Sequence, residues 1–314
     1  MNVIITGCAG FIGSHACDVF LEKGYNVIGV DKLTYASNME NLQNALKSKN
    51  FNFIECDIRN EALIKHLCSA RRVEWIINFA AESHVDNSIV GCDPFIESNL
   101  NGIVSLLEAC KDLKVKLLHV STDEVYGPAD NNIEFDELSN LNPKNPYSAS
   151  KASAEHFINA FANTFDVNYI IVRPSNNFGP RQHSEKFIPT IASKIFRKEK
   201  IPVYGLGLQS REWTYVKDTA NAIEFILQNS KLNEIYNITS KKELENIQTI
   251  KNIFDFVPQN FTQDCIDIIE DRPGHDKRYC ISNQKLSSIG WEDYSDYNQS
   301  LKATIDYYLK RSKF

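Results

Sequence analysis

Tyr147 and Lys151 are the two residues whose types and spacing point most directly to chemistry. They lie four positions apart, just after Pro146, and proline suits the first turn of a helix. One helical turn therefore separates them, and both side chains project from the same helical face. A lysine cation beside a phenol stabilises the phenolate and lowers the phenol pKa from about 10, so the pair predicts a general base that works near neutral pH. Taken alone, such a pair is more often part of an exposed helix surface.

A second reactive segment, Ser121–Gly127, carries the adjacent acids Asp123 and Glu124 directly after Thr122. It follows an expected strand at 116–120, and open parallel sheets bind ligands at the carboxyl ends of their strands. Two neighbouring carboxyl groups can act separately as acid and base when a closed site moves their pKa values apart. Taken alone, two acids after a strand can equally be solvated turn residues.

Three glycines at positions 7, 10 and 13 are informative because the chain of 314 residues has only 13 glycines. They follow an expected strand at 2–6 and open a helix, a context in which glycines allow a tight turn and close approach of a pyrophosphate to the helix N-terminus. Asp31 lies 18 positions beyond Gly13, where a carboxylate accepts from a ribose 2′-hydroxyl and repels a 2′-phosphate. The spacing G-x-x-G-x-x-G is less specific than G-x-G-x-x-G, so the context carries the prediction of NAD rather than NADP. The alternative is a glycine-rich turn without a ligand.

Short apolar runs alternate with helical patterns over the first 175 residues. The expected strands are 2–6, 26–30, 52–55, 74–79, 116–120 and 168–173, and the expected helices lie near 12–23, 60–70, 94–113 and 148–165. This alternation predicts an α/β fold, a doubly wound parallel Rossmann sheet over residues 1–175 with possible later returns of the chain. Beyond it, prolines and glycines divide the chain into shorter pieces, with helices expected near 187–198, 217–229, 246–256 and 298–311. We expect residues 176–314 to form mainly a smaller C-terminal substrate-binding lobe.

Composition and charge exclude several classes of function. The net charge of −6 argues against electrostatic capture of nucleic acid or of an anionic membrane, and no run approaches the roughly 18 apolar residues that span a bilayer. The eight cysteines form no C-x-x-C pair, which favours buried thiols in a reducing compartment and predicts a cytoplasmic protein. We expect no metal, because no second ligand cluster accompanies His84.

Several motifs together resemble the extended short-chain dehydrogenase/reductase family. Besides the glycine turn and Tyr147-x-x-x-Lys151, the matching segments are Asp31–Tyr35, Ala80–Asp86, Ser175–Asn177, Glu185–Pro189 and Asp271–Asp276. Within that family, Thr122-Asp123-Glu124 is similar to the nucleoside-diphosphate-glucose 4,6-dehydratases. The resemblance covers essentially the whole chain.

The resemblance implies NAD-dependent dehydration of dTDP-glucose or UDP-glucose to the 4-keto-6-deoxy sugar nucleotide, an early step of rhamnose-type deoxysugar synthesis. Oxidising C4 makes the C5 proton acidic, which allows the 6-hydroxyl to leave. By this resemblance Tyr147 removes the C4 hydroxyl proton, Lys151 supports it, and Thr122 binds the C4 oxygen. Glu124 takes the C5 proton, and a protonated Asp123 gives its proton to the leaving hydroxyl.

The resemblance also implies two sets of binding residues and a homodimer joined by the helices near 94–113 and 148–165. The cofactor-binding set is Gly7, Gly10, Phe11, Ile12, Gly13, Asp31, Lys32, Leu33, Thr34, Asp57, Ile58, Ala80, Ala81, Glu82, Ser83, Ser98, Tyr147, Lys151 and Asn177. The substrate-binding set is Ser83, Thr122, Asn176, Lys186, Phe187, Tyr204, Arg211, Asn237, Arg272 and His275. Arg211 and Arg272 are the expected clamps for the diphosphate, since a guanidinium fork matches phosphate oxygens.

Two features of the sequence leave the nucleotide of the substrate undetermined. Two other functions also remain as alternatives. The short segment between Gly127 and Tyr147 is similar to the plant UDP-glucose enzymes, whereas Pro273-Gly274-His275 is similar to the dTDP-glucose enzymes. An NAD-dependent sugar-nucleotide 4-epimerase or decarboxylase is the main alternative, although the Asp-Glu pair has no evident purpose in it. A non-catalytic NAD-sensing module is a further alternative, which the intact Tyr/Lys pair disfavours.

Overall fold

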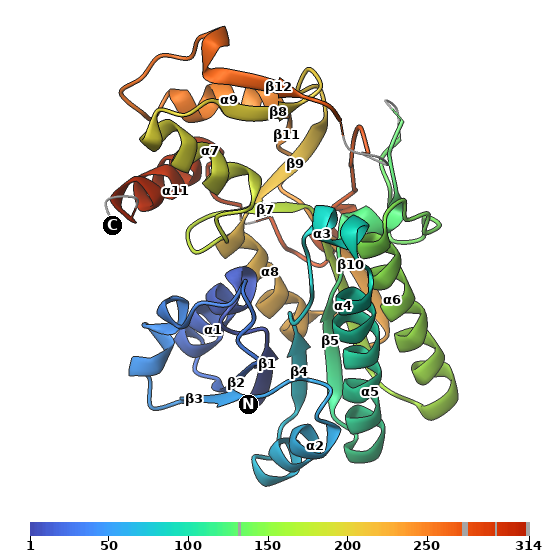
Figure 1. Cartoon of the computed structure of the whole chain (residues 1–314). Coiled ribbons are helices and arrows are strands. Elements are labelled where there is room, and N and C mark those ends of the chain that lie inside the picture. Colours follow the sequence, from blue (N-terminus) through green and yellow to red (C-terminus); the bar gives the residue numbers. More distant parts are fainter. Residues whose placement is uncertain (131–132, 272–275, 293, 312–314) are drawn as a thin grey trace.

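A seven-stranded, fully parallel sheet forms the larger lobe of the molecule (Figure 1). The structure is a computed structural model that describes residues 1–130, 133–271, 276–292 and 294–311. The strands run in the order β10-β6-β5-β4-β1-β2-β3. Their bounds are β1 Asn2–Thr6, β2 Asn26–Asp31, β3 Phe51–Glu55, β4 Trp75–Asn78, β5 Lys116–Val120, β6 Tyr169–Pro174 and β10 Glu234–Ile238. The predicted doubly wound α/β fold is thereby confirmed.

Helices cover both faces of this sheet, which explains why its strands are apolar along their length. Side chains alternate between faces along a strand, so Val3 and Ile5 pack in one core cluster and Ile4 packs in the other. The first cluster includes residues of α1 (Phe11–Glu22) and α8 (Val216–Asn229). The second includes residues of α2 (Glu61–Ala70), α5 (Gly102–Leu113) and α6 (Pro146–Phe165).

The helix that carries Tyr147 and Lys151 begins two residues earlier than predicted. Asn145 caps α6 by accepting from the Ser148 backbone N–H at 2.9 Å, and Ser148 accepts in return from the Asn145 N–H. Pro146 occupies the first turn, where its missing N–H costs no hydrogen bond. The helix expected at 94–113 is instead three pieces: α4 (Asp93–Phe95), the π-helical turn η3 (Ile96–Asn101) and α5.

Short strands of a smaller lobe lie beyond the sheet's carboxyl edge (Figure 1). They form a three-stranded sheet of β7 (Asn176–Phe178), β9 (Ser210–Tyr215) and β11 (Glu243–Glu245), and a pair of β8 (Ile201–Tyr204) with β12 (Ile266–Ile269). The helices α7 (Phe187–Arg197), α9 (Asn246–Phe254) and α11 (Tyr297–Arg311) share a hydrophobic core with these strands. Between the segments that form the smaller lobe, the chain returns to the larger lobe, where β10 pairs with β6 and α8 packs on α1.

The remaining elements are short. They are η1 (Met39–Leu42), η2 (Ala45–Lys47), α3 (Val85–Val90), η4 (Asp123–Tyr126), η5 (Gln263–Cys265) and α10 (Gln284–Ser288). Among the described residues, no helix combines the length and the hydrophobicity needed to cross a bilayer. The same residues contain no group of three or more His, Cys, Asp or Glu side chains arranged to hold a metal ion.

Candidate active site

The glycine turn is a cradle in which two positions have no room for a side chain. Gly7 has a φ of +62°, and a Cβ there would lie 2.7 Å from the Ala80 backbone nitrogen. A Cβ on Gly13 would collide with the Gly7 carbonyl oxygen, and one on Gly10 would lie 3.1 Å from that oxygen. The turn therefore brings the start of α1 close to the end of β4. Because the glycines have no side chains, the backbone at the helix N-terminus, which favours an anion, is left uncovered. This geometry fits the pyrophosphate of a dinucleotide.

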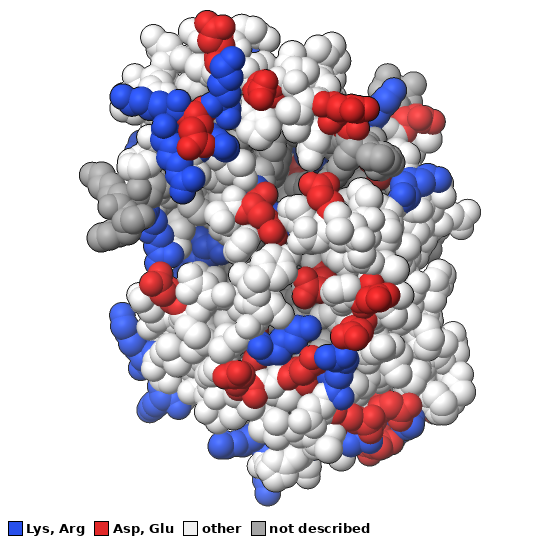
Figure 2. Space-filling model, viewed as in Figure 1, with Lys and Arg blue, Asp and Glu red and all other residues white. Residues whose placement is uncertain are grey.

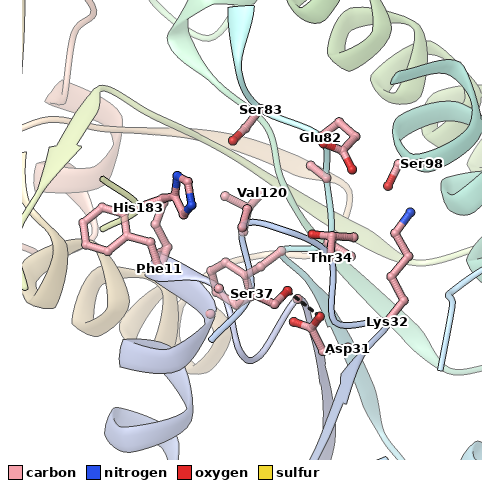
Figure 3. A pocket seen from close by; sticks show the side chains of 18 of the residues that line it. Phe11, Asp31, Lys32, Thr34, Ser37, Glu82, Ser83, Ser98, Val120 and His183 are labelled. Atoms are coloured by element: carbon pink, nitrogen blue, oxygen red, sulfur yellow. Dashed lines mark hydrogen bonds between the residues drawn. The ribbon is translucent and has the colours of Figure 1, made fainter. Parts of the chain in front are cut away.

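Asp31 is a rigidly held acceptor at the end of β2. Its carboxylate accepts from the Ala9 N–H at 2.9 Å, the Leu33 N–H at 2.8 Å and the Ser37 hydroxyl at 2.7 Å. Figure 3 shows Asp31 joined to Ser37 at one end of a cavity, with Ser83 toward the other end. A carboxylate in this fixed orientation is suited to accept from a ribose hydroxyl.

Most residues of the expected cofactor-binding set line this first cavity. They are Gly7, Gly10, Phe11, Ile12, Gly13, Asp31, Lys32, Thr34, Ile58, Ala80, Ala81, Glu82, Ser83, Ser98, Tyr147 and Lys151. The structure places Leu33, Asp57 and Asn177 elsewhere. Asp57 is engaged by Arg59 at 2.9 Å, which contributes to lowering the Asp57 pKa against the opposing effect of burial, and Asn177 lines a second cavity.

The motif Thr122-Asp123-Glu124 follows β5 as predicted. Its side chains, however, lie in surroundings that differ from one another. Thr122 caps η4, and its hydroxyl donates to Asp123 Oδ1 at 3.2 Å. The other oxygen of Asp123, Oδ2, is buried and has no hydrogen-bond partner among the described residues. Glu124 instead lines the second cavity and accepts from Asn145 Nδ2 and from the Tyr279 hydroxyl, each at 3.4 Å. The two adjacent acids therefore have separate environments.

Burial disfavours the ionised form of Asp123. Desolvation raises the pKa of Asp123 well above its ordinary value, with further contributions from the negative charges of Glu124 and Glu212. Arg211 and the Thr122 hydrogen bond act in the opposite direction but are smaller. A carboxyl group kept protonated in this way can donate a proton, which is the behaviour expected of a general acid.

Tyr147 and Lys151 both line the first cavity, but one prediction about them is wrong. Burial, and then the charge of Glu124, raise the pKa of Tyr147 instead of lowering it, and Lys151 is not among the groups that shift it. Lys151 is also buried: its Nζ donates to the Val120 carbonyl at 2.7 Å, and burial lowers the pKa of Lys151 to about 8.

The second cavity lies between the lobes and shares wall residues with the first. Ser83, Gln182, Glu185 and Lys186 line both cavities. Of the expected substrate-binding set, Ser83, Asn176, Lys186, Phe187, Tyr204 and Arg211 line the second. Of the expected catalytic side chains, Tyr147 and Lys151 line the first cavity and Glu124 lines the second, whereas Thr122 and Asp123 line neither.

Four residues of the expected substrate-binding set remain, of which Thr122, described above, lines neither cavity. Asn237 is fully buried in β10, where its Oδ1 accepts from the Tyr126 hydroxyl at 2.9 Å and its Nδ2 donates to the Phe135 carbonyl at 3.2 Å. It thus has interior partners for its amide and lines neither cavity. Arg272 and His275 lie outside the described residues, so their expected contacts remain predictions.

Sequence reasoning missed several residues in the cavity walls. Gln182 and His183 line the first cavity, and the aromatic side chains of Trp213 and Tyr279 line the second. Arg211 stacks over the Tyr279 ring at 4.5 Å from its centroid. No spacing rule connects β9 with the segment around residue 279, so no local signal in the sequence pointed to these contacts.

Comparison with known proteins identifies the family. The family model described as GDP-mannose 4,6 dehydratase matches residues 4–304. The chain belongs to this family. It is 42% identical over 311 residues to a Haloferax volcanii protein named low-salt glycan biosynthesis protein Agl12, covering 98% of this chain and 99% of the relative. It is 37% identical over 324 residues to a dTDP-glucose 4,6-dehydratase from Xanthomonas campestris, covering 98% and 92%.

A solved dehydratase structure matches the fold over the whole chain. The structure of DesIV from Streptomyces venezuelae, a dTDP-glucose 4,6-dehydratase with NAD and TYD bound, superposes with a TM-score of 0.95 at 35% identity. The match covers 100% of this chain and 98% of that one. The resemblance to the nucleoside-diphosphate-glucose 4,6-dehydratases, inferred from motifs, is thereby confirmed.

Proposed function

We propose that the protein is an NAD-dependent hydro-lyase that removes water from a nucleoside-diphosphate glucose to give the 4-keto-6-deoxy sugar nucleotide. The observation that carries this proposal is the buried Asp123, whose pKa burial raises, next to Glu124, which lines the second cavity, with Tyr147 in the wall of the first. An epimerase needs no such acid. The dehydration needs both a proton donor for the 6-hydroxyl and a base for C5.

The side chains divide the chemistry between them. Tyr147 receives the proton of the C4 hydroxyl, and Thr122, whose side chain acts to lower the Tyr147 pKa, positions the C4 oxygen. Glu124 removes the C5 proton, and Asp123 gives its proton to the departing 6-hydroxyl, so that one water leaves. When bound, NAD supplies the oxidation at C4 and the matching reduction at C6, and the overall reaction is redox-neutral.

Unused hydrogen-bond acceptors in the cavity walls support a hydroxyl-rich ligand. Asn176 Oδ1, Asn177 Oδ1 and Gln182 Oε1 are buried and have no hydrogen-bond partner within the described part of the chain. All three residues line the second cavity. A buried acceptor without a donor is costly, and the hydroxyl groups of a hexose would supply donors.

The diphosphate requires positive charge inside the cavity, because the protein as a whole is acidic. On the face shown in Figure 2, acidic and basic side chains are interspersed over both lobes. Within the second cavity, Lys186 and Arg211 supply the cations, and Lys186 Nζ donates to the Ser83 carbonyl at 2.8 Å. We assign these two residues to the diphosphate.

A substrate assay tests the proposed function. Purified protein is incubated separately with dTDP-glucose and UDP-glucose, and the products are weighed by mass spectrometry. Loss of one water from either substrate supports the proposal, and the faster reaction identifies the nucleotide. An unchanged mass with a changed sugar configuration would instead indicate a 4-epimerase, and no reaction with either would contradict the proposal.

We further propose a cytoplasmic homodimer. The eight cysteines are all free thiols, in keeping with a reducing compartment. Apolar side chains are exposed on neighbouring elements: Val90 of α3 is 91% exposed, Ile96 of η3 43% and Phe157 of α6 41%. A second copy that pairs the helices of this face would cover them. Light scattering at micromolar concentration should show a dimer that Phe157→Glu weakens, and a wild-type monomer would contradict the proposal.

A further inference from the structure

The turn that carries the two acids, η4, depends on other elements for its position. It is a 3₁₀ turn of four residues, Asp123–Tyr126, and the backbone hydrogen bonds at its two ends measure 3.5 and 3.2 Å between nitrogen and oxygen. Turns of this kind have poor hydrogen-bond geometry and occur as short connectors. Where Asp123 and Glu124 lie relative to Tyr147 is therefore decided by contacts from outside the turn.

A buried ion pair between Glu155 of α6 and Arg173 of β6 contacts both ends of η4. The two side chains are 1% and 3% exposed, and Arg173 Nη2 is 2.5 Å from Glu155 Oε2. Just before η4, the Ser121 hydroxyl donates to Glu155 Oε1 at 2.5 Å. In the last residue of η4, the Tyr126 hydroxyl oxygen accepts from Arg173 Nη1 at 2.5 Å. One ion pair thus holds the turn at its start and at its end.

The same ion pair relates η4 to the helix of Tyr147 and Lys151. Lys151 follows Tyr147 by one turn of α6, and Glu155 follows Lys151 by one more turn. The catalytic side chains of α6 and those of η4 are therefore connected through Glu155. Burying an ion pair costs the hydration of both charges, and an apolar pair of similar size often gives equal stability. Stability alone therefore does not explain why Glu155 and Arg173 are present.

We propose that Glu155 and Arg173 are positioning residues that hold η4 against α6, so that Asp123 and Glu124 act on the same sugar as Tyr147. The inference rests on the proposed function, in which Tyr147 serves the oxidation at C4 and the two acids serve the removal of water. A displaced η4 leaves the oxidation possible but slows the elimination, since a misplacement of about 1 Å costs about 100-fold in rate. The sign of a lost contact is therefore an accumulated 4-keto sugar that still has its 6-hydroxyl.

Ser121 and Tyr126 allow the contacts at the two ends of η4 to be removed without changing any charge. Glu155 is less suitable for this purpose because its charge also acts on Lys151: burial lowers the pKa of Lys151, and Glu155 opposes that effect. Ser121→Ala removes the hydroxyl that donates to Glu155. Tyr126→Phe removes the hydroxyl that accepts from Arg173 and keeps the ring.

Both variants should fold, because Val125 and the Tyr126 ring pack with Ala152 of α6 in an apolar cluster. We expect each variant to remove water about tenfold more slowly and the double variant about 100-fold more slowly, with little change in KM. Mass spectrometry of quenched reactions should show the 4-keto sugar with its 6-hydroxyl in the variants, and the absorbance of the reduced cofactor should rise with it.

Two matched controls make the same chemical changes elsewhere on α6 and β6. The Tyr169 hydroxyl of β6 donates to Asn159 of α6 at 2.6 Å, so Tyr169→Phe removes a hydroxyl that joins the same two elements directly. Ser153→Ala removes a hydroxyl that donates to the Ala149 carbonyl at 2.9 Å within α6. Both controls should keep the wild-type rate. Wild-type rates in the test variants, or slower reactions without the accumulated 4-keto sugar, would overturn the proposal.

Hydrogen exchange followed by mass spectrometry provides a readout that does not depend on activity. In the protein loaded with NAD, we expect the backbone amides of residues 121–127 to exchange about tenfold faster in the double variant than in the wild type or the controls. Unchanged exchange in this segment would overturn the proposal. A wild-type protein that removes water from neither sugar nucleotide would refute the proposed function, and faster exchange would still support the contacts that hold η4.

Discussion

The two cavities of the active site are built by different means. The first, at the carboxyl edge of the large sheet, is shaped mainly by backbone: Gly7 and Gly13 are needed because a Cβ at either position would strike neighbouring main chain. The second is shaped by side chains such as Phe187, Trp213 and Arg211, which come from separate elements of the smaller lobe. A cavity shaped by backbone tolerates few substitutions, whereas one shaped by side chains can change its ligand through individual residues.

Asp123 is buried next to Glu124, which lines the second cavity, and its substitution is expected to show the largest effect. Asp123→Asn keeps the shape of the side chain and removes the proton donor. We expect the rate of water loss to fall about 1000-fold, within the range for loss of a general acid. The rate is measured by mass spectrometry, together with NAD content to establish that the cofactor site is intact. A variant with wild-type rate would show that the acid lies elsewhere.

Gly13→Ala tests whether the first cavity depends on its backbone. The added methyl group must displace the Gly7 carbonyl or the start of α1. Such overpacking costs about 3 kcal/mol, which corresponds to an NAD affinity about 100-fold weaker. Calorimetric titration with NAD measures it. Gly91→Ala is the control, since a Cβ there meets no atom within 4 Å, and equal losses in both variants would argue against the cradle.

Arg211→Lys tests whether ligand binding in the second cavity depends on individual side chains. The Arg211 guanidinium donates to the Ser210 carbonyl at 2.7 Å and to the Asp276 carbonyl at 2.9 Å, which orients its fork. Lysine keeps the charge but loses the fork, so we expect KM for the sugar nucleotide to rise about tenfold with little change in kcat. NAD affinity should stay the same. A fall in NAD affinity instead would show that the two cavities are not separate binding sites.

The smallest expected effect concerns stability. Burial raises the Asp123 pKa in the folded protein, so this residue favours folding fully only below its unfolded pKa of about 3.9 and loses that contribution as the pH rises toward the folded value. Asp123→Asn removes the titration. We therefore expect its melting temperature to exceed that of the wild type at pH 7.5, on the order of 2 °C, and the difference to vanish near pH 3.5. A difference independent of pH would contradict the assignment of a neutral Asp123.

The contrast between the two cavities also explains which site residues could be predicted from the sequence. The first cavity follows from regular elements and from glycines at a readable spacing, so most of its lining residues were predicted. The strands β7 to β9 are three to six residues long and lie among prolines and glycines, where no periodicity develops. Trp213 and Tyr279 reach the wall of the second cavity only through the folding of the chain, so their place in the site could not be predicted.

Electrostatic behaviour was harder to predict than position. The four-residue spacing placed Tyr147 and Lys151 on one helix correctly, yet the pKa of the phenol is raised rather than lowered, because burial has the largest effect on it. Asn237 gives the same lesson, since its amide is engaged inside the protein by Tyr126 and Phe135. Spacing predicts which residues share a face, but it contains no information about desolvation.

The central claim, that both cavities act on one sugar in a single redox-neutral reaction, is tested most directly with an isotope. The protein is incubated with nucleoside-diphosphate glucose deuterated at C4, and the product is analysed by NMR and mass spectrometry. We predict loss of one water with the deuterium recovered in the C6 methyl group. Deuterium retained at C4, or lost to the solvent, would contradict the account.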